Sequence, residues 1–192
     1  MESGSIPPIR RSGIEEIVCD TKNRTLLNMW QWAYSDLIGN TERGIIAEYL
    51  VALACGIDVK PRISWDAYDM QLDNGIKIEV KSSGYLQTWK QKRYSKPMFN
   101  IPKTFAWDSL ENVYETHAKR QADVYVFAVH SHKDIATINS LDTNQWEFYV
   151  LSTSVLNDKM GDKKQIGLNK LLELGTIGSN FNDLLSTIMK TI

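Results

Sequence analysis

The residues best suited to chemistry lie in segment 68–81, which reads YDMQLDNGIKIEVK. Apolar and polar residues alternate on both sides of an Asp-Asn-Gly sequence, and this pattern predicts a β-hairpin. A three-residue loop at 73–75, with its glycine in the left-handed position of a type I turn plus bulge, places the apolar residues of both strands on one face. The expected pairs on that face are Leu72 with Ile76, Met70 with Ile78, and Tyr68 with Val80.

The opposite face of this hairpin would carry two acids and two lysines. In the same register the expected pairs are Asp69 with Glu79, Gln71 with Lys77, and Ala67 with Lys81. A two-residue loop would instead pair Asp69 with Val80 and set the acid among apolar side chains, so burial of the apolar set favours the longer loop. The same parity points Asp66 toward the buried face, away from the other acids, unless the strand bends there.

Two carboxylates opposed across a hairpin need a positive charge between them. Their side-chain bases would lie about 5 Å apart, where like charges repel. A hard divalent cation with oxygen ligands, Mg²⁺ or Mn²⁺, would remove this conflict. Lys81 projects from the same face as Glu79 and could contact a phosphate or a metal-bound water. The competing interpretation is a solvated strand face, on which alternating Lys and Glu are common, although such a face gains nothing from opposed acids.

The elements that must position these residues follow from the hydrophobic periodicity. Helical spacing predicts helices at about 22–37, 42–55, 109–120, 166–174 and 181–190. Strands are expected near 57–63, 68–72, 75–82, 124–129 and 146–151, the fourth as a central strand covered on both faces. We therefore expect an α/β protein, with a flexible N-terminal arm at 1–13 and a single domain at 14–192. Its mixed central sheet would carry the hairpin and would be flanked by helices.

Composition restricts the function classes. The chain has 192 residues, 43% of them hydrophobic, and a net charge of -1, so there is no global electrostatic case for nucleic acid. Any such contact would be local, at a basic segment interleaved with aromatic residues. From this segment alone, a basic loop that is merely exposed to solvent is an interpretation of equal weight. The members are Lys90, Lys92, Arg93, Lys96 and Lys103, with Trp89, Tyr94 and Phe99.

The cysteines and the hydrophobic runs bear on the compartment. Cys19 and Cys55 lack metal-type spacing and favour a reduced intracellular protein. No apolar run is long enough to span a bilayer, and residues 1–13 lack the apolar centre of an export signal. The expectation is a cytoplasmic protein with no membrane partner.

At these residues the sequence resembles the PD-(D/E)-x-K nuclease superfamily. Its pattern is an Asp at the start of one strand and acid-x-Lys on the next, and Asp69 and Glu79-Val80-Lys81 occupy those positions. Many members add a Glu on a preceding helix, where Glu48 stands. The order continues through Ser82-Ser83 and Arg120-Gln121-Ala122-Asp123, so the resemblance covers about 41–153. Tyr68 replaces the superfamily's proline, which varies among members.

The resemblance implies a restriction endonuclease-like fold and hydrolysis of phosphodiester bonds. Asp69 and Glu79, with Glu48, would hold one or two magnesium ions, and Lys81 would orient or deprotonate the attacking water. The most specific reading is a DNA endonuclease of restriction or defence type. A homodimer is expected by analogy, because two copies would address two strands. Further nucleic-acid contacts are expected from Lys77 and Ser83, together with Lys90, Lys92, Arg93 and Lys96.

Three alternatives remain open at this stage. The first is a non-catalytic nucleic-acid-binding or scaffolding domain that retains the nuclease fold. The second is a transition-metal site at His130-x-His132, for which no third ligand is evident nearby. The third is a purely structural protein with acidic and basic stripes.

Overall fold

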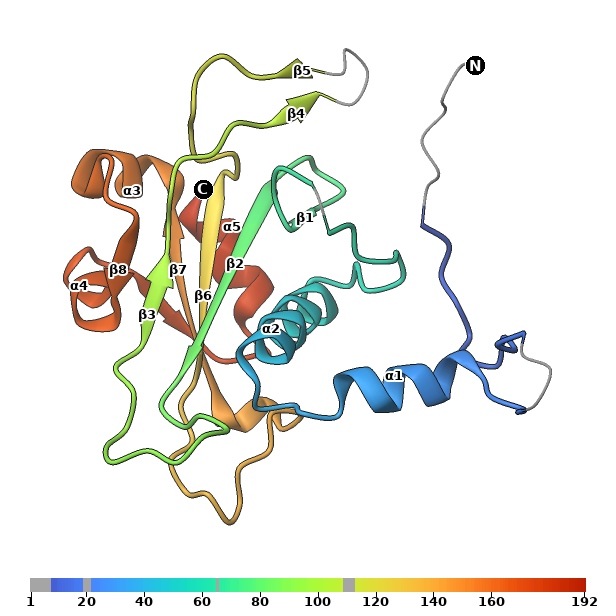
Figure 1. The fold of residues 1–192 in the computed structure, drawn as a ribbon. Coiled ribbons are helices and arrows are strands. Elements are labelled where there is room, and N and C mark those ends of the chain that lie inside the picture. Colours follow the sequence, from blue (N-terminus) through green and yellow to red (C-terminus); the bar gives the residue numbers. More distant parts are fainter. Residues whose placement is uncertain (1–7, 19–21, 65, 109–112) are drawn as a thin grey trace.

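The protein is organised around one five-stranded sheet, seen in a computed structural model that describes residues 8–18, 22–64, 66–108 and 113–192 (Figure 1). The strand order is β1-β2-β6-β7-β9, where β1 is Met70–Gln71, β2 Lys77–Gly84, β6 Val124–His130, β7 Trp146–Ser152 and β9 Ile177–Ser179. Strands β2 and β6 pair in parallel and the other neighbours are antiparallel, so the sheet is mixed as predicted.

The central strand β6 is buried along its whole length. Its seven residues, VYVFAVH, form the nearly continuous apolar run expected of a strand covered on both faces. One cover is made by α2 (Asn40–Ala54) and α5 (Leu184–Thr191), whose apolar residues pack against Ile78 and Val80 of β2. The other is made by α3 (Thr153–Met160), α4 (Leu168–Glu173) and the small sheet of β3 (Met98–Asn100) and β8 (Gln165–Gly167) (Figure 1).

The hairpin adopts the predicted three-residue loop. Gly75 has φ of 91°, and its N–H donates to the Leu72 carbonyl at 2.9 Å. The Leu72 N–H donates to the Ile76 carbonyl at 2.9 Å, and Met70 lies opposite Ile78. This register places Leu72, Ile76 and Ile78 in one hydrophobic core, which confirms the predicted division of faces for these residues.

Beyond Met70 the prediction was wrong, because the regular ladder ends there. Tyr68 does not lie over Val80: it packs against the core on the other face of the sheet, with the Lys77 ammonium 5.1 Å from its ring centroid. The backbone therefore breaks its alternation between Tyr68 and Met70. Asp69 lies at this break, off the regular strand rather than in a cross-strand pair with Glu79.

Several other expected elements differ. Segment 57–63 forms a turn at 58–60 and otherwise irregular chain rather than a strand. The predicted helix at 109–120 was also wrong: 109–112 lie outside the described residues, and Val113–Tyr114 form β5, paired with β4 (Trp107–Asp108). The first helix is shorter than predicted, with α1 at Leu26–Tyr34. None of the helices in the described ranges is long and apolar enough to cross a membrane.

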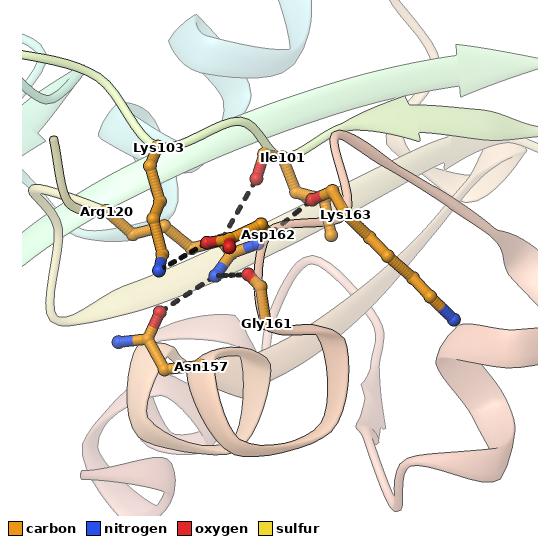
Figure 2. A network of polar contacts seen from close by, with 7 residues as sticks. All are labelled: Ile101, Lys103, Arg120, Asn157, Gly161, Asp162 and Lys163. Atoms are coloured by element: carbon orange, nitrogen blue, oxygen red, sulfur yellow. Dashed lines mark hydrogen bonds and ion pairs between the residues drawn. The ribbon is translucent and has the colours of Figure 1, made fainter.

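A buried arginine fixes the layer formed by α3 and β3. The Arg120 side chain donates to three backbone carbonyls, those of Ile101 and Lys163 and, at 3.1 Å, Gly161. It also donates to the Asn157 side chain at 2.8 Å (Figure 2). The acceptors come from the end of α3 and the residues after it, and from the chain that follows β3, so the guanidinium joins these two segments. All of them are neutral oxygens. The Arg120 to Asp123 sequence therefore has a structural role ahead of β6.

Candidate active site

Asp69 is held where the hairpin leaves the sheet. Its Oδ2 atom accepts a hydrogen bond of 2.7 Å from the Val80 N–H, and its own N–H donates to the Ile78 carbonyl at 3.1 Å. In a continued antiparallel ladder the Val80 N–H would have paired with the Tyr68 carbonyl. The Asp69 carboxylate therefore accepts the hydrogen bond that a strand carbonyl would have accepted, and it lies against β2.

The electrostatic surroundings of Asp69 are unfavourable to its charge. Burial, followed by the negative charges of Glu79 and Glu48, raises the pKa of Asp69 to about 7, against an opposing effect of the Val80 N–H and of Lys81. The acids contributed by β2 and by α2 are thus both near enough to affect the same carboxyl group. Asp69 is therefore the acid on which the charges of Glu48 and Glu79 both act.

Glu79 and Lys81 form an ion pair on β2. The Lys81 Nζ donates to Glu79 Oε1. The exposed fraction of the side chain is 26% for Lys81 and 18% for Glu79. In the sheet, Glu79 lies beside Tyr125 of β6 and Lys81 beside Phe127. Burial, followed by the charge of Glu79, raises the pKa of the Tyr125 phenol. Glu79 therefore stands at the border between the apolar core and the surface.

Glu48 projects from α2 into a cleft of about 580 Å³ that also contains Asp69. Both carboxylate oxygens of Glu48 accept hydrogen bonds from Arg62, and the Arg62 Nη2 to Glu48 Oε1 distance is 2.9 Å. This bidentate contact raises the pKa of Arg62. Sequence reasoning missed Arg62, since its segment was interpreted as a strand and nothing in the local pattern indicated its partner.

Asp66 also differs from expectation. It lines the same cleft as Asp69, because residues 66–69 precede the strand and parity does not apply to them. The cleft wall on the α2 side is largely apolar, formed by Ile45, Tyr49, Ala52 and Ile57. The acidic end of the cleft thus continues into a hydrophobic trough.

The predicted basic segment forms an ordered loop at residues 85–97, here called the basic loop. Gln91 ties it together: its amide donates to the Tyr85 carbonyl at 3.2 Å and to Ser95 Oγ at 3.0 Å, and its Oε1 accepts from the Gln87 N–H. Lys133 adds a further cation 4.2 Å from the Tyr85 ring centroid. The exposed side chains are Trp89, Lys90, Lys92, Arg93, Tyr94 and Lys96.

Three of the other predicted nucleic-acid contacts have structural partners. Phe99 is 2% exposed and packs edge-on against Phe127, so its expected role in stacking on a base was wrong. The Ser83 hydroxyl accepts from the Met98 N–H at 3.3 Å. The Lys77 N–H donates to Asp123 at 2.8 Å, while its ammonium lies over Tyr68.

The two histidines do not share a site. His130 is 1% exposed, stacks on Trp146 with ring centroids 4.7 Å apart, and lies 3.4 Å from the Gln145 amide oxygen. Burial lowers the pKa of His130 to about 4. His132 pairs with Thr137 in the following loop. The alternative of a transition-metal site at His130-x-His132 has no support in this arrangement.

The chemistry of the acidic cluster fits a hard divalent cation. Glu48, Asp69 and Glu79 offer carboxylate oxygens, and a cation would favour the ionised form that burial and repulsion disfavour in Asp69. Across the part of the chain that the structure describes, no three acidic, histidine or cysteine side chains already converge closely enough to hold a metal ion. Arg62 and Lys81 instead pair with two of the three acids.

Comparison with known proteins adds no family assignment. No protein-family model matches the chain, and a search of curated proteins gave no match.

Proposed function

We propose that the protein is a metal-dependent nuclease that hydrolyses phosphodiester bonds, most specifically a DNA endonuclease. The observation that carries this proposal is the environment of Asp69. Its carboxylate is fixed by the Val80 N–H at the end of the ladder and interacts electrostatically with acids from two different elements. Arg62 and Lys81 pair with Glu48 and Glu79, so the unfavourable charge is that of Asp69, and a buried carboxylate beside two other acids is costly unless it serves a cation.

Each residue has a distinct task under this proposal. Asp69, Glu79 and Glu48 would hold magnesium or manganese, which when bound would polarise the phosphoryl oxygen and stabilise charge on the leaving 3′ oxygen. Lys81 lies beside Glu79, so its ammonium would orient the attacking water, while only its neutral amine form would take the water's proton. Arg62 would exchange its contact with Glu48 for a phosphate group, two of whose oxygens a guanidinium can also bind in a bidentate contact.

The basic loop supplies the electrostatic attraction that the whole chain lacks. Its exposed lysines and arginine come after the C-terminal end of β2, the strand that carries Glu79 and Lys81. Trp89, 58% exposed, and Tyr94, 53% exposed, offer flat surfaces to unpaired bases. The loop is hydrogen-bonded internally, so little ordering would be needed on binding.

Cleavage assays with a matched ion-pair control test this proposal. Plasmid, single-stranded DNA, branched DNA and RNA would be incubated with Mg²⁺ or Mn²⁺ and with wild type, Glu79→Gln or Lys81→Met. The control is Glu173→Gln, which breaks an exposed Lys170–Glu173 pair on α4. We expect Lys81→Met to lower the rate by roughly 10²–10⁴-fold, Glu79→Gln to abolish metal-dependent cleavage, and the control to cleave normally. Cleavage unchanged in Glu79→Gln would remove the proposed site.

A non-catalytic nucleic-acid-binding domain is the second candidate. The pairing of Glu48 with Arg62 and of Glu79 with Lys81 favours it, because paired acids can be purely structural. Calorimetry separates the two functions. Uptake of Mn²⁺ that is lost in Asp69→Asn supports the nuclease, whereas nucleic-acid binding without any metal uptake supports the binding domain.

A further inference from the structure

Helix α2 has a second apolar face, which lines the cleft instead of the sheet. Its first apolar face is buried in the core through residues that include Leu50 and Val51. Ile45, Tyr49 and Ala52 line the cleft, and their spacing of four and three residues makes one stripe along the helix. The outer face of a surface helix usually carries polar residues. An apolar stripe along a concave site therefore indicates a ligand.

The chain between α2 and β1 adds further apolar residues to this trough (Figure 1). Ile57, Pro61 and Ile63 come from that connection, and Met70 comes from the hairpin. The cleft volume of about 580 Å³ falls within the range of about 300–1,000 Å³ that is typical of small-molecule sites. The cleft can therefore enclose part of a ligand, and apolar side chains from three elements of the fold would contact it.

The charged groups of the same cleft are those that the proposed function assigns to a cation and a phosphate. Glu48 and Asp69 line the cleft as proposed metal ligands, and Arg62 lines it as the proposed phosphate contact. Glu48 belongs to the apolar stripe, three residues after Ile45 and four before Ala52. Helix residues at these spacings have Cβ atoms about 5–6 Å apart. A substrate phosphate held at Glu48 would therefore have its neighbouring atoms beside the trough.

The part of a nucleotide that suits such a trough is the base, because it has flat apolar faces. In a duplex these faces are covered by stacking, and proteins contact the base edges from the grooves. A base must leave the stack before a concave site can receive it. Unpaired bases present their faces to aromatic and apolar side chains. The trough is therefore complementary to an unpaired base, whereas a paired base cannot enter it.

Tyr49 is the better placed of two cleft tyrosines to stack on a base. Its side chain lines the cleft and is 52% exposed. Tyr68 also lines the cleft, but the Lys77 ammonium lies 5.1 Å from its ring centroid. The Tyr68 hydroxyl donates to Gln71 Oε1 at 3.2 Å. The Tyr68 ring thus already has partners within the fold, and Tyr49 remains as the aromatic surface of the trough.

We propose that the cleft binds an unpaired nucleotide, with its base in the trough against Tyr49 and its phosphate at the acidic end. The protein would then select DNA that is single-stranded at the scissile phosphate, as in free strands, flaps and branch points. This inference rests on the proposed nuclease function and adds the substrate class to it. Stacking tolerates every base, because each base has such a face, so no strict base sequence is expected.

Cleavage of one sequence in three forms tests the selection. A labelled strand would be supplied alone, as the flap of a duplex and as a full duplex, each with Mn²⁺. Tyr49→Ala removes the ring and Ala52→Trp fills the trough. The control, Leu53→Trp, places the same side chain on the next residue of α2, which is 41% exposed and does not line the cleft.

We expect wild type and Leu53→Trp to cleave the strand and the flap in preference to the duplex. Tyr49→Ala and Ala52→Trp should each cleave the single strand roughly 5–100-fold more slowly, the range that loss of one base stack gives. Cleavage of the duplex should change little in either variant. The circular dichroism melting curves of all variants should resemble that of wild type.

Binding by the Lys81→Met variant locates the base, because slow cleavage leaves the strand intact. Strands with one abasic site at successive positions would be compared with the intact strand by fluorescence anisotropy. One position should weaken binding by roughly 5–100-fold. Adding Tyr49→Ala should remove the difference at that position, since the intact base then has no ring to stack on. A purely structural role of Tyr49 would not depend on a single base.

Two results would overturn this inference and leave the nuclease function standing. The duplex could be cleaved at least as fast as the single strand, or Tyr49→Ala and Ala52→Trp could cleave like Leu53→Trp. No cleavage by wild type, combined with Tyr49-dependent binding of single strands, would reject the nuclease function and keep the unpaired base in the trough. Neither cleavage nor binding would reject both.

Discussion

Replacement of Asp69 by asparagine should stabilise the protein at neutral pH in the absence of divalent cations. The introduced amide would keep an oxygen for the Val80 N–H while losing the charge that Glu79 and Glu48 repel. Because the pKa of Asp69 rises from 3.8 to about 7 on folding, the folded state binds more protons than the unfolded state between these values. Stability from this group is therefore greatest at acidic pH and is lost as pH rises through about 7.

The magnitude follows from the same shift. A shift of the Asp69 pKa from 3.8 to about 7 changes the free energy of unfolding by roughly 4 kcal/mol between pH values well below and well above this range. About 2.5 kcal/mol of this change falls between pH 5 and pH 8. Partial solvation of the site lowers these figures, so a gain of about 1–3 kcal/mol at pH 8 is the working expectation. At pH 5 the gain from Asp69→Asn should be smaller by a similar amount.

Urea unfolding at pH 5 and pH 8 with a chelator measures this difference. Asp73→Asn is the matched control, since Asp73 is an exposed acid in the turn of the same hairpin and should change stability little at either pH. Adding Mn²⁺ at pH 8 should stabilise wild type and narrow its difference from Asp69→Asn, because the cation favours the ionised acid. A variant less stable than wild type at pH 8, or a stability difference that does not depend on pH, would refute the reasoning.

Three further predictions concern parts of the fold that position the site. Arg120→Met should lower the free energy of unfolding by about 1–3 kcal/mol in urea titrations, because the buried Ile101 carbonyl and three part-buried oxygen acceptors lose their donor. Gly84→Ala should cost about 1–3 kcal/mol in the same assay, since the added Cβ would lie 3.0 Å from Cζ of the buried Arg43. Lys92→Ala should reduce the salt dependence of DNA binding, lowering the slope of log K against log salt by about 0.9 for a lost duplex phosphate contact. Lys164→Ala, which removes an exposed lysine outside the basic loop, should leave the slope unchanged.

The hairpin loop could be predicted because its causes are local. Gly75 permits the left-handed turn, and burial of Leu72, Ile76 and Ile78 enforces one register. The same method failed a few residues earlier. There the backbone is directed by a contact between the Asp69 side chain and the Val80 N–H, which no alternation of residue types records.

The missed elements had weaker or misleading signals. Segment 57–63 alternates like a strand, yet Pro61 and Arg62 line the cleft and the Arg62 head group pairs with Glu48 on a distant helix. Helix α3 follows β7 without a loop, and its local signals are the Ser152 hydroxyl that accepts from the Val155 N–H and Gly161, with positive φ, at its end. A helix-like composition at 109–120 concealed the pairing of Trp107 with Tyr114, a contact of edge-on rings 4.8 Å apart.

The departure from the predicted ladder brings the Asp69 carboxylate under the influence of acids from both layers, as the proposed function requires. In a continued strand, the Asp69 side chain would project from the face that carries Glu79, while Glu48 lies on a helix that covers the opposite face. Ending the ladder at Met70 frees the Val80 N–H, which then holds the Asp69 carboxylate at the margin of the sheet. From that margin the carboxylate interacts with Glu48 on one side and Glu79 on the other. The irregularity that defeated the sequence pattern is therefore what joins the acids of the two layers.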